Sequence, residues 1–493
     1  MAPRRTDKTR PDVEVLIVGA GFSGLGLGVR LKQAGRDSFL IIEKADEVGG
    51  TWRDNTYPGC ACDIPSHLYS LSFEPKADWS RLYPPQPELF DYLKGVAEKH
   101  GLYEHIRLKT KMDKAAWDEN AGLWRLTTDR GDTITARVLV SAIGALHIPQ
   151  VPKLKGIETF KGAAFHSAQW RHDVDLTGKK VAVIGTGASA IQFVPQVAPT
   201  AESLTLFQRT PPWVLPKIDG PIGPVQQWLF KHLPGYRRAF RALIYWINEA
   251  RALALVNNST MLRAGESLAR RHIEKQIKDP ALRAKVTPSY RMGCKRVLLA
   301  NDYYSTLARD NVAVVTDGVA EVRARSIVDT AGVEHPADAI IYGTGFDVTD
   351  SLANLPVTGK DGLRLKQAWK DGARGYFGIT VSGFPNFFIM LGPNTGLGHN
   401  SQIVMIEGQI NYVMSALAKM DAGKLRALDL KPQVLEAHDA KVQAKLQNSV
   451  WQKGGCVSWY QDETGRNVTL WPGFTFDYVR KTRDVKLDEY EAA

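Results

Sequence analysis

One short pattern occurs twice in this chain and constrains its fold more than any other feature. The apolar run at 15–18 leads into Gly19-Ala-Gly21-Phe-Ser-Gly24 and a helix-like stretch, and a second apolar run then ends at Glu43. The same order returns at 181–184, with Gly185-Thr-Gly187-Ala-Ser-Ala190 and a run that ends near Arg209. A strand, a glycine turn, a helix and a second strand form a β-α-β unit. The repetition predicts an α/β protein with two nucleotide-binding units rather than one large sheet.

The glycine turns have the geometry that a dinucleotide requires. Gly19, Gly21 and Gly24, with Ser23 inside the same loop, let the backbone approach a pyrophosphate at a helix N-terminus, where unpaired N–H groups favour an anion. The GxGxxG pattern alone is weak evidence for a nucleotide site, because about 0.3 such patterns are expected by chance in a chain of this length and glycine content. The flanking strand and helix, and an acid 19 positions after Gly24, make a turn without a ligand the less favoured alternative.

The two units differ at one equivalent position. Glu43 lies 24 positions after Gly19, and Arg209 lies 24 positions after Gly185. A carboxylate at this position accepts hydrogen bonds from ribose hydroxyls and repels a 2′-phosphate, whereas a guanidinium pairs with that phosphate. The first unit should therefore hold FAD or NAD. The second should hold NADPH, with Thr210 and Lys295 able to share the phosphate, unless Arg209 is only a solvated charge at a strand end.

Composition excludes several classes of protein. No apolar run approaches the roughly 18 residues that cross a bilayer, and the charged segment at 1–12 lacks the apolar core of a secretory signal. Four cysteines exclude a disulfide scaffold and suit the reducing cytoplasm. The net charge of +11 favours anionic partners without identifying them, and no motif supports nucleic-acid binding.

Helical periodicity replaces the strand pattern between Pro211 and Lys295, so we expect a helical insertion there. Residues 222–258 mix apolar and basic side chains, which would suit a helix lying on an anionic membrane surface. The favoured interpretation is a lid over a substrate pocket, packed on the second unit. The apolar residues are too mixed in sequence for a clean amphipathic stripe, so peripheral membrane contact is the less favoured alternative.

The segment after the first unit carries a more specific signal. It matches in full the signature (A/G)GxW-x4-(F/Y)P(G/M)-x3-D of the Baeyer–Villiger monooxygenases, a group of class B flavin monooxygenases, through Gly49, Gly50, Trp52, Tyr57, Pro58, Gly59 and Asp63. The second family signature, FxGxxxHxxxW(P/D), is met by Phe160, Gly162, His166 and Trp170 and departs at Arg171. The chain therefore resembles the type I, FAD- and NADPH-dependent members of this family over nearly its whole length.

The resemblance implies a set of site residues. FAD would lie on Gly19, Gly21, Ser23, Gly24 and Glu43, with Gly50, Thr51, Trp52, Asp63 and Tyr69 near the flavin and Gln402 facing it. NADPH would lie on Gly185, Thr186, Gly187, Ala188, Ser189, Ala190, Arg209, Thr210, Lys295 and Arg296, and Trp459 would contact cofactor or substrate. Arg296 matches the active-site arginine of the family, and Asp63 would orient it, which makes these two the catalytic candidates. A surface ion pair for Arg296 and an Asx turn for Asp63 are the structural alternatives.

The implied activity is the insertion of one oxygen atom from O2 beside a ketone carbonyl, giving an ester or lactone by way of NADPH and a flavin C4a-peroxide. A fixed cation stabilises a peroxide anion, and arginine suits this role because it keeps its proton. Sister enzymes that oxygenate amines or sulfides need no such cation and are the alternative, followed by a flavin-binding membrane-surface or sensor protein. The CxC spacing of Cys60 and Cys62 argues against a disulfide reductase, and His166 has no partner histidine for a metal site.

The resemblance also predicts how the chain is divided. We expect two Rossmann-like dinucleotide-binding domains, for FAD and NADPH, with a helical insertion. The predicted bounds are 1–146 for the first part of the FAD domain, 147–213 for the first part of the NADPH domain, 214–295 for the helical insertion, 296–349 for the rest of the NADPH domain and 350–493 for the rest of the FAD domain.

Overall fold

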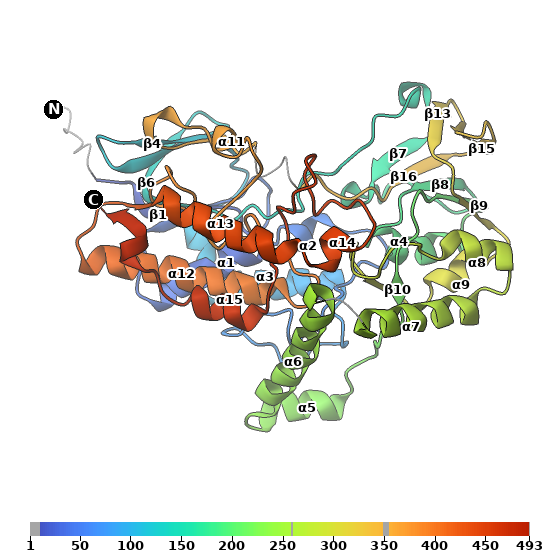
Figure 1. Ribbon diagram of the computed structural model, residues 1–493, viewed down its shortest axis with the longest axis horizontal. Coiled ribbons are helices and arrows are strands. Elements are labelled where there is room, and N and C mark those ends of the chain that lie inside the picture. The colour runs from blue at the N-terminus through green and yellow to red at the C-terminus, as the bar shows by residue number, and fades with distance from the viewer. Residues whose placement is uncertain (1–9, 258–259, 349–353, 493) are drawn as a thin grey trace.

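The computed structural model describes residues 10–257, 260–348 and 354–492. Figure 1 shows two α/β lobes side by side, one around β1 and β6 and the other around β8 and β16, with α5 and α6 projecting below them. The expectation about the extreme N-terminus and the predicted bound between 349 and 350 both lie outside the described residues. Two separate sheets follow from the two glycine units, as predicted.

The first sheet contains the N-terminal glycine unit. Its strand order is β17-β4-β5-β6-β1-β2-β3, and β18 also pairs with β6. The central strands run parallel, whereas β4, β5 and β6 form an antiparallel meander. The strands are β1 (Val13–Val18), β2 (Phe39–Ile42), β3 (Ile106–Arg107), β4 (Met112–Asp118), β5 (Leu123–Thr128), β6 (Thr133–Ser141), β17 (Val357–Thr358) and β18 (Phe387–Ile389).

Helices from both ends of the chain cover this sheet. On α1, Gly26 lies so close to Ile410 of α12 that an added Cβ would be 3.0 Å from the isoleucine Cδ1, so the glycine lets the two helices approach. In turn α12 packs on α15. The helices are α1 (Phe22–Gln33), α2 (Thr51–Asp54), α3 (Gln86–Lys99), α11 (Leu365–Ala368), α12 (Gln402–Ala422), α13 (Pro432–Leu446), α14 (Val450–Lys453) and α15 (Thr475–Lys481); β19 (Leu428–Leu430) and β20 (Tyr490–Ala492) pair beside them.

The second sheet is fully parallel and has the order β12-β9-β8-β16-β7. All its strands come from residues 163–342, whereas the first sheet draws strands from both sides of that range. Its elements are β7 (Ala163–His166), β8 (Lys180–Ile184), α4 (Ala190–Val197), β9 (Ser203–Phe207), α9 (Tyr303–Leu307), β12 (Val312–Val315) and β16 (Ala339–Tyr342), with a small antiparallel sheet of β13 (Val319–Arg323), β14 (Ser326–Asp329) and β15 (Glu334–Pro336).

Helices fill most of the predicted insertion. They are α5 (Pro224–His232), α6 (Tyr236–Asn257), α7 (Thr260–Gln276) and α8 (Pro280–Val286), and the short parallel pair β10 (Val214–Leu215) and β11 (Leu298–Leu299) closes the segment. The insertion packs on both lobes, because α7 contacts α9 of the second sheet while α6 contacts α14 of the first lobe. No helix among the described residues has the length and apolar character needed to cross a membrane.

The first glycine turn supplies a test of the fold. A Cβ on Gly24 would lie 1.9 Å from the carbonyl oxygen of Gly19, so Gly24→Ala must push α1 away from β1. We expect the free energy of unfolding to fall by about 2–3 kcal/mol in urea denaturation. The control is Gly95→Ala in α3, where an added Cβ meets nothing within 4 Å. It should stabilise the chain by roughly 0.5–1 kcal/mol, and equal effects of the two substitutions would contradict the argument.

Candidate functional site

The first glycine loop is held by Glu43 at the end of β2. The buried carboxylate accepts backbone N–H bonds from Ala20 at 2.9 Å and from Ala45 at 3.0 Å, and it pairs with Arg53 at 3.3 Å. Gly19 has φ +109°, a conformation that side chains rarely adopt, and an added Cβ would lie 2.6 Å from the carbonyl oxygen of Ala142. The turn therefore requires glycine at position 19, and the bonds of Glu43 hold its carboxylate at the edge of the loop.

Two glycines from different loops face each other beside the N-terminus of α1. A Cβ on Gly50 would lie 3.2 Å from the Cα of Gly21, so a side chain at position 50 would press on the other loop, whereas a Cβ on Gly21 would lie 3.8 Å from the Cα of Gly50, in ordinary contact. The first turn of α1 contains no acidic residue, which leaves its N–H groups in a positive field. A pyrophosphate fits this arrangement of bare backbone and helix terminus.

Trp52 and Tyr69 form an aromatic corner behind this loop. The indole N–H of Trp52 donates to the Tyr69 hydroxyl at 3.3 Å, and the rings meet edge to face with centroids 5.6 Å apart. Burial raises the pKa of the Tyr69 phenol, so it stays protonated and able to donate. Thr51 begins α2 next to Trp52. The structure thus brings together the residues predicted to surround a flavin, while their contact with it stays a prediction.

The two catalytic candidates meet directly. The guanidinium of Arg296 donates from Nε to Oδ2 of Asp63 at 3.0 Å and also from Nη2 to the same oxygen. Asp63 raises the pKa of Arg296 further above its usual value, so the side chain is cationic at every working pH. Their side chains are still 37% and 30% exposed, which leaves part of each group open to a ligand.

A phenol completes this pair and was not predicted. Burial raises the pKa of Tyr460 to about 12, while the nearby Arg296 lowers it. Lys217 also lies in the electrostatic environment of Asp63, and burial lowers the pKa of its ammonium. Both residues come from segments far from Asp63 in sequence. Tyr460 directly follows the predicted Trp459, but neither Tyr460 nor Lys217 was itself predicted, and the three-dimensional arrangement identifies both.

The second glycine loop is more open than the first. Gly187 and Ala188 are exposed at the turn, and the Thr186 hydroxyl donates to the carbonyl oxygen of Thr210 at 3.3 Å. Gly185 has φ +103° and faces the carbonyl oxygen of Gly343, to which an added Cβ would lie 2.5 Å away. The loop is therefore fixed at its base and accessible at its tip, as a phosphate-binding turn must be.

Two cations stand beside this loop. Arg209 is exposed and has no ion pair within the part of the chain that the structure describes. Burial, and secondly the positive charge of Arg209, lower the pKa of Lys295. Two neighbouring cations without an acid between them repel each other, and a bound dianion would relieve this repulsion. A 2′-phosphate fits that charge.

Gln192 of α4 connects the two lobes, and sequence reasoning missed it. Its Oε1 accepts the Tyr57 hydroxyl at 3.0 Å and the Ala61 N–H at 3.3 Å, and its Nε2 donates to the Ala61 carbonyl at 2.9 Å. Gly59 lies against the same turn, since an added Cβ would be 2.8 Å from the Gln192 carbonyl oxygen. The family-signature loop that ends at Asp63 is therefore held by the helix of the second glycine unit.

The remaining sequence predictions have simple structural outcomes. Cys60 and Cys62 are free buried thiols, as expected from their spacing, and burial raises the pKa of Cys60 to about 11. His166 is buried at the end of β7, where its Nδ1 accepts the Ala168 N–H at 3.1 Å. Arg171 pairs with the adjacent Asp173 at the surface. The departure from the second signature thus lies outside the packed core.

The contacts that Gln402 and Trp459 make with neighbouring residues do not test their predicted roles. The Gln402 amide, oriented to satisfy both of its ends, bonds the Thr395 carbonyl oxygen at 3.2 Å and the Leu397 N–H at 2.9 Å. It therefore holds the glycine turn before α12. Trp459 is 44% exposed and touches Tyr460, with ring centroids 4.5 Å apart. Contact of either residue with a cofactor stays a prediction.

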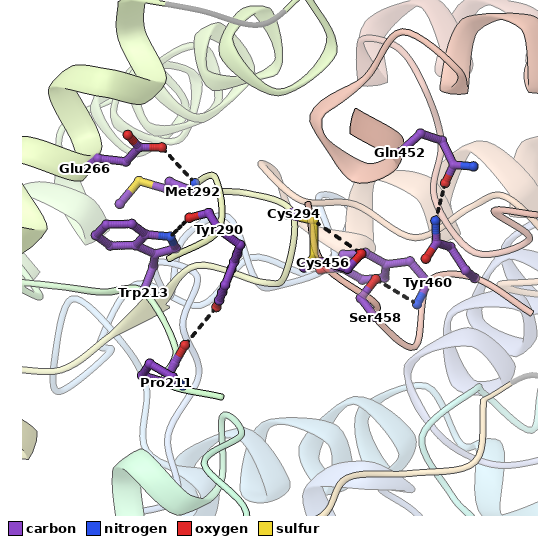
Figure 2. The surroundings of a disulfide bond; sticks show 11 residues. Pro211, Trp213, Glu266, Tyr290, Met292, Cys294, Gln452, Cys456, Ser458 and Tyr460 are labelled. Atoms are coloured by element: carbon purple, nitrogen blue, oxygen red, sulfur yellow. Dashed lines mark hydrogen bonds between the residues drawn. A yellow bond between two sulfur atoms is a disulfide. The ribbon is translucent and has the colours of Figure 1, made fainter. Parts of the chain in front are cut away.

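A disulfide joins the segments that carry Arg296 and Tyr460, and the composition did not predict it. Figure 2 shows the Cys294–Cys456 bond, with labelled residues of the 211–213 and 290–292 segments on one side and of the 456–460 loop on the other. The backbone N–H of Arg291 donates to the Gly454 carbonyl at 3.0 Å alongside it. A Cβ on Gly454 would lie 2.5 Å from the Cβ of Cys294, so the glycine permits this contact.

The cross-link can be tested by counting thiols and by unfolding. Unreduced protein unfolded in denaturant should titrate two thiols, those of Cys60 and Cys62, and reduced protein four. Cys456→Ser should lower the free energy of unfolding by about 2–4 kcal/mol. Added dithiothreitol should destabilise the parent chain to the same level and leave the variant unchanged. Four thiols before reduction would contradict the disulfide.

A family model and several solved structures match this chain. A family model described as pyridine nucleotide-disulphide oxidoreductase matches residues 16–226. Among solved structures, cyclohexanone monooxygenase from Rhodococcus bound to NADP+ has a TM-score of 0.88 at 28% identity, covering 98% of this chain and 99% of that chain. The OTEMO complex with FAD and NADP has a TM-score of 0.87 at 28% identity, covering 98% and 100%.

Curated relatives give higher identity. A Baeyer-Villiger monooxygenase of Pseudomonas aeruginosa is 48% identical over 99% of this chain and 93% of its own length. One of Streptomyces coelicolor is 47% identical over 98% of this chain and 93% of its own length. Identity of this extent over nearly the whole length of both relatives indicates common descent, and the chain belongs to the Baeyer–Villiger monooxygenases.

Proposed function

We propose that this enzyme holds FAD on the first glycine loop and NADPH on the second, and converts a ketone and O2 to an ester or lactone. One observation carries the proposal: Arg296 and Asp63 form an ion pair that stays partly open, although the two residues are 233 positions apart in sequence. A cation held in this way suits a reaction in which negative charge develops on oxygen.

The residues around each loop support this choice of cofactors. When bound, FAD and NADPH supply hydride transfer and the activation of oxygen. Glu43 presents a carboxylate edge for ribose hydroxyls, and the close approach of Gly21 and Gly50 suits a pyrophosphate. Arg209 and Lys295 favour the phosphorylated form of the nicotinamide cofactor, because both would pair with a 2′-phosphate.

Arg296 supplies positive charge and hydrogen bonds to the reacting oxygen atoms. Its planar guanidinium keeps its proton, so it stabilises an anion without removing a proton from the substrate. Asp63 uses one carboxylate oxygen to orient the guanidinium, which leaves its other N–H groups for substrate. Tyr460 stays protonated beside the pair and is a second possible donor.

The division of the chain, the remaining roles and the location are part of the proposal. We propose the FAD domain at 1–146 and 350–493 and the NADPH domain at 147–213 and 296–349. The helical insertion at 214–295 separates the two parts of the NADPH domain. The separate origins of the two sheets support this division. Gln402 and Trp459 would complete the cofactor sites. The low number of cysteines, four in 493 residues, supports a cytoplasmic location, whereas the Cys294–Cys456 disulfide does not.

The proposal is tested by a panel of cyclic, linear and aryl ketones, with identification of the products. We expect NADPH consumption that ketones stimulate, and an ester or lactone that carries one atom of labelled O2. Stimulation by amines or sulfides, with N- or S-oxides as the only products, would favour the sister reaction. Purified protein that binds no FAD would overturn the proposal.

Arg296→Ala should separate the two halves of the reaction. We expect ester formation to fall by about 100-fold or more, as for the loss of a donor that stabilises developing charge. Reduction of bound flavin by NADPH should change by less than about threefold under the same assignment. Arg291→Ala is the control, because Arg291 lies on the same segment but pairs with Glu266 at 3.0 Å. Ester formation retained in Arg296→Ala would contradict the role of Arg296.

Arg209→Ala tests the choice of NADPH. Loss of a charged hydrogen bond to the 2′-phosphate should raise KM for NADPH by about 10–100-fold and leave kcat nearly unchanged. KM for NADH, which lacks that phosphate, should not change. Arg325→Ala, an exposed arginine of the same lobe, should alter neither value. An equal loss with both cofactors would show that Arg209 supports the fold rather than the phosphate.

A further inference from the structure

Helix α6 has an apolar face that points away from the protein. At helical spacing, seven apolar residues lie exposed along it, and none of them carries charge: Ala239, Ala242, Leu243, Trp246, Ile247, Ala250 and Leu253. We call this set the outer stripe. Leu243, Trp246 and Ile247 are 57%, 58% and 53% exposed, which is unusual for three large apolar side chains in one turn of a helix.

The opposite face of α6 is firmly anchored, so the outer stripe cannot turn inward. The buried Glu249 accepts from the Thr475 hydroxyl at 2.8 Å and from the Asn400 amide at 2.6 Å. Ile244 and Leu255 are buried on the same side. One apolar face of α6 is therefore packed against the protein, and the other face is free to contact a surface outside it.

Neighbouring elements extend the outer stripe. Trp228 of α5 is 60% exposed, and Val225 and Leu233 are exposed with it. Phe476 at the start of α15 is also exposed, and its ring lies 6.2 Å from that of Trp246, centroid to centroid. Figure 1 shows α5 and α6 as the part of the molecule that projects farthest below the two lobes. An extended flat surface could therefore reach these side chains.

The exposed charges on α5 and α6 themselves have one sign. Residues 221–257 contain five basic residues and a single acid, Glu249, which is buried. Lys231, Arg238 and Arg251 are exposed on α5 and α6. Asp477, the acid nearest Phe476 in sequence, is already paired with Arg480 and Lys481. Two copies of this face would repel each other, whereas an anionic surface would attract it.

From the outer stripe and its basic border we infer that α5 and α6 dock this enzyme on a lipid bilayer that contains anionic headgroups. Trp228 and Trp246 are amphipathic rings of the kind that lie at headgroup level, with Leu243 and Ile247 reaching the acyl chains. The cations would contact lipid phosphates. The sequence favoured a lid over membrane contact because the apolar residues looked mixed; the structure separates them into two faces. This inference is independent of the proposed reaction.

The test is sedimentation of the FAD-loaded full chain with vesicles, without substrate. We expect binding to vesicles of equal parts phosphatidylcholine and phosphatidylglycerol, and about 100-fold weaker binding to pure phosphatidylcholine, since three exposed cations would lose their attraction. Binding should also fall steeply with added salt. Equal binding to both kinds of vesicle, or none to either, would overturn the inference.

Matched variants make the test specific to α6. Ile247→Glu should weaken binding tenfold or more, whereas Val333→Glu, at a residue of the other lobe with the same 53% exposure, should not. Arg238→Glu should weaken binding by about 30-fold, and Lys366→Glu, exposed on α11, much less. Thermal melting should show that all four variants fold. A concentration-dependent dimer that Ile247→Glu abolishes would assign the stripe to a second copy instead and overturn the inference.

Discussion

The ion pair between Asp63 and Arg296 joins residues that are 233 positions apart, and much of the structure serves to bring them together. Gln192 holds the loop that ends at Asp63, and the Cys294–Cys456 disulfide and Gly454 hold the segment that leads to Arg296. Separating the two groups would leave each partly buried charge without its partner. The Asp63–Arg296 ion pair therefore links the two lobes, and its arginine is the group proposed to act on substrate.

The sequence was informative wherever the chemistry is local. The glycine turns at 19–24 and 185–190, and the contrast between Glu43 and Arg209, depend on spacings of about two dozen residues that a β-α-β unit imposes. Asp63 and Arg296 were identified through the resemblance to a family, and the structure places them in contact. The two partners could thus be named from sequence, whereas their geometry depends on the fold.

Other parts of the site could not be predicted because they depend on contacts between distant segments. Gln192 lies in an ordinary amphipathic helix, and its side chain has meaning only once Tyr57 and Ala61 face it. Cys294 and Cys456 are separated by 162 residues, and no spacing rule links them. The apolar stripe of α6 was missed for a different reason. Both faces of this helix carry apolar residues, so the sequence lacks the regular alternation of apolar and polar positions that marks an amphipathic helix.

The topology of the first sheet has a consequence for synthesis of the chain. Strand β18 pairs with β6 through Phe387–Leu139 and its neighbours, and β17 pairs with β4, so this sheet needs strands made long after its first ones. On the ribosome, the whole parallel sheet at 163–342 emerges before β18 does. Until then β6 has an open hydrogen-bonding edge, the feature of partly made proteins on which chaperones act. The second lobe can thus fold during translation, whereas the first must wait for its last strand.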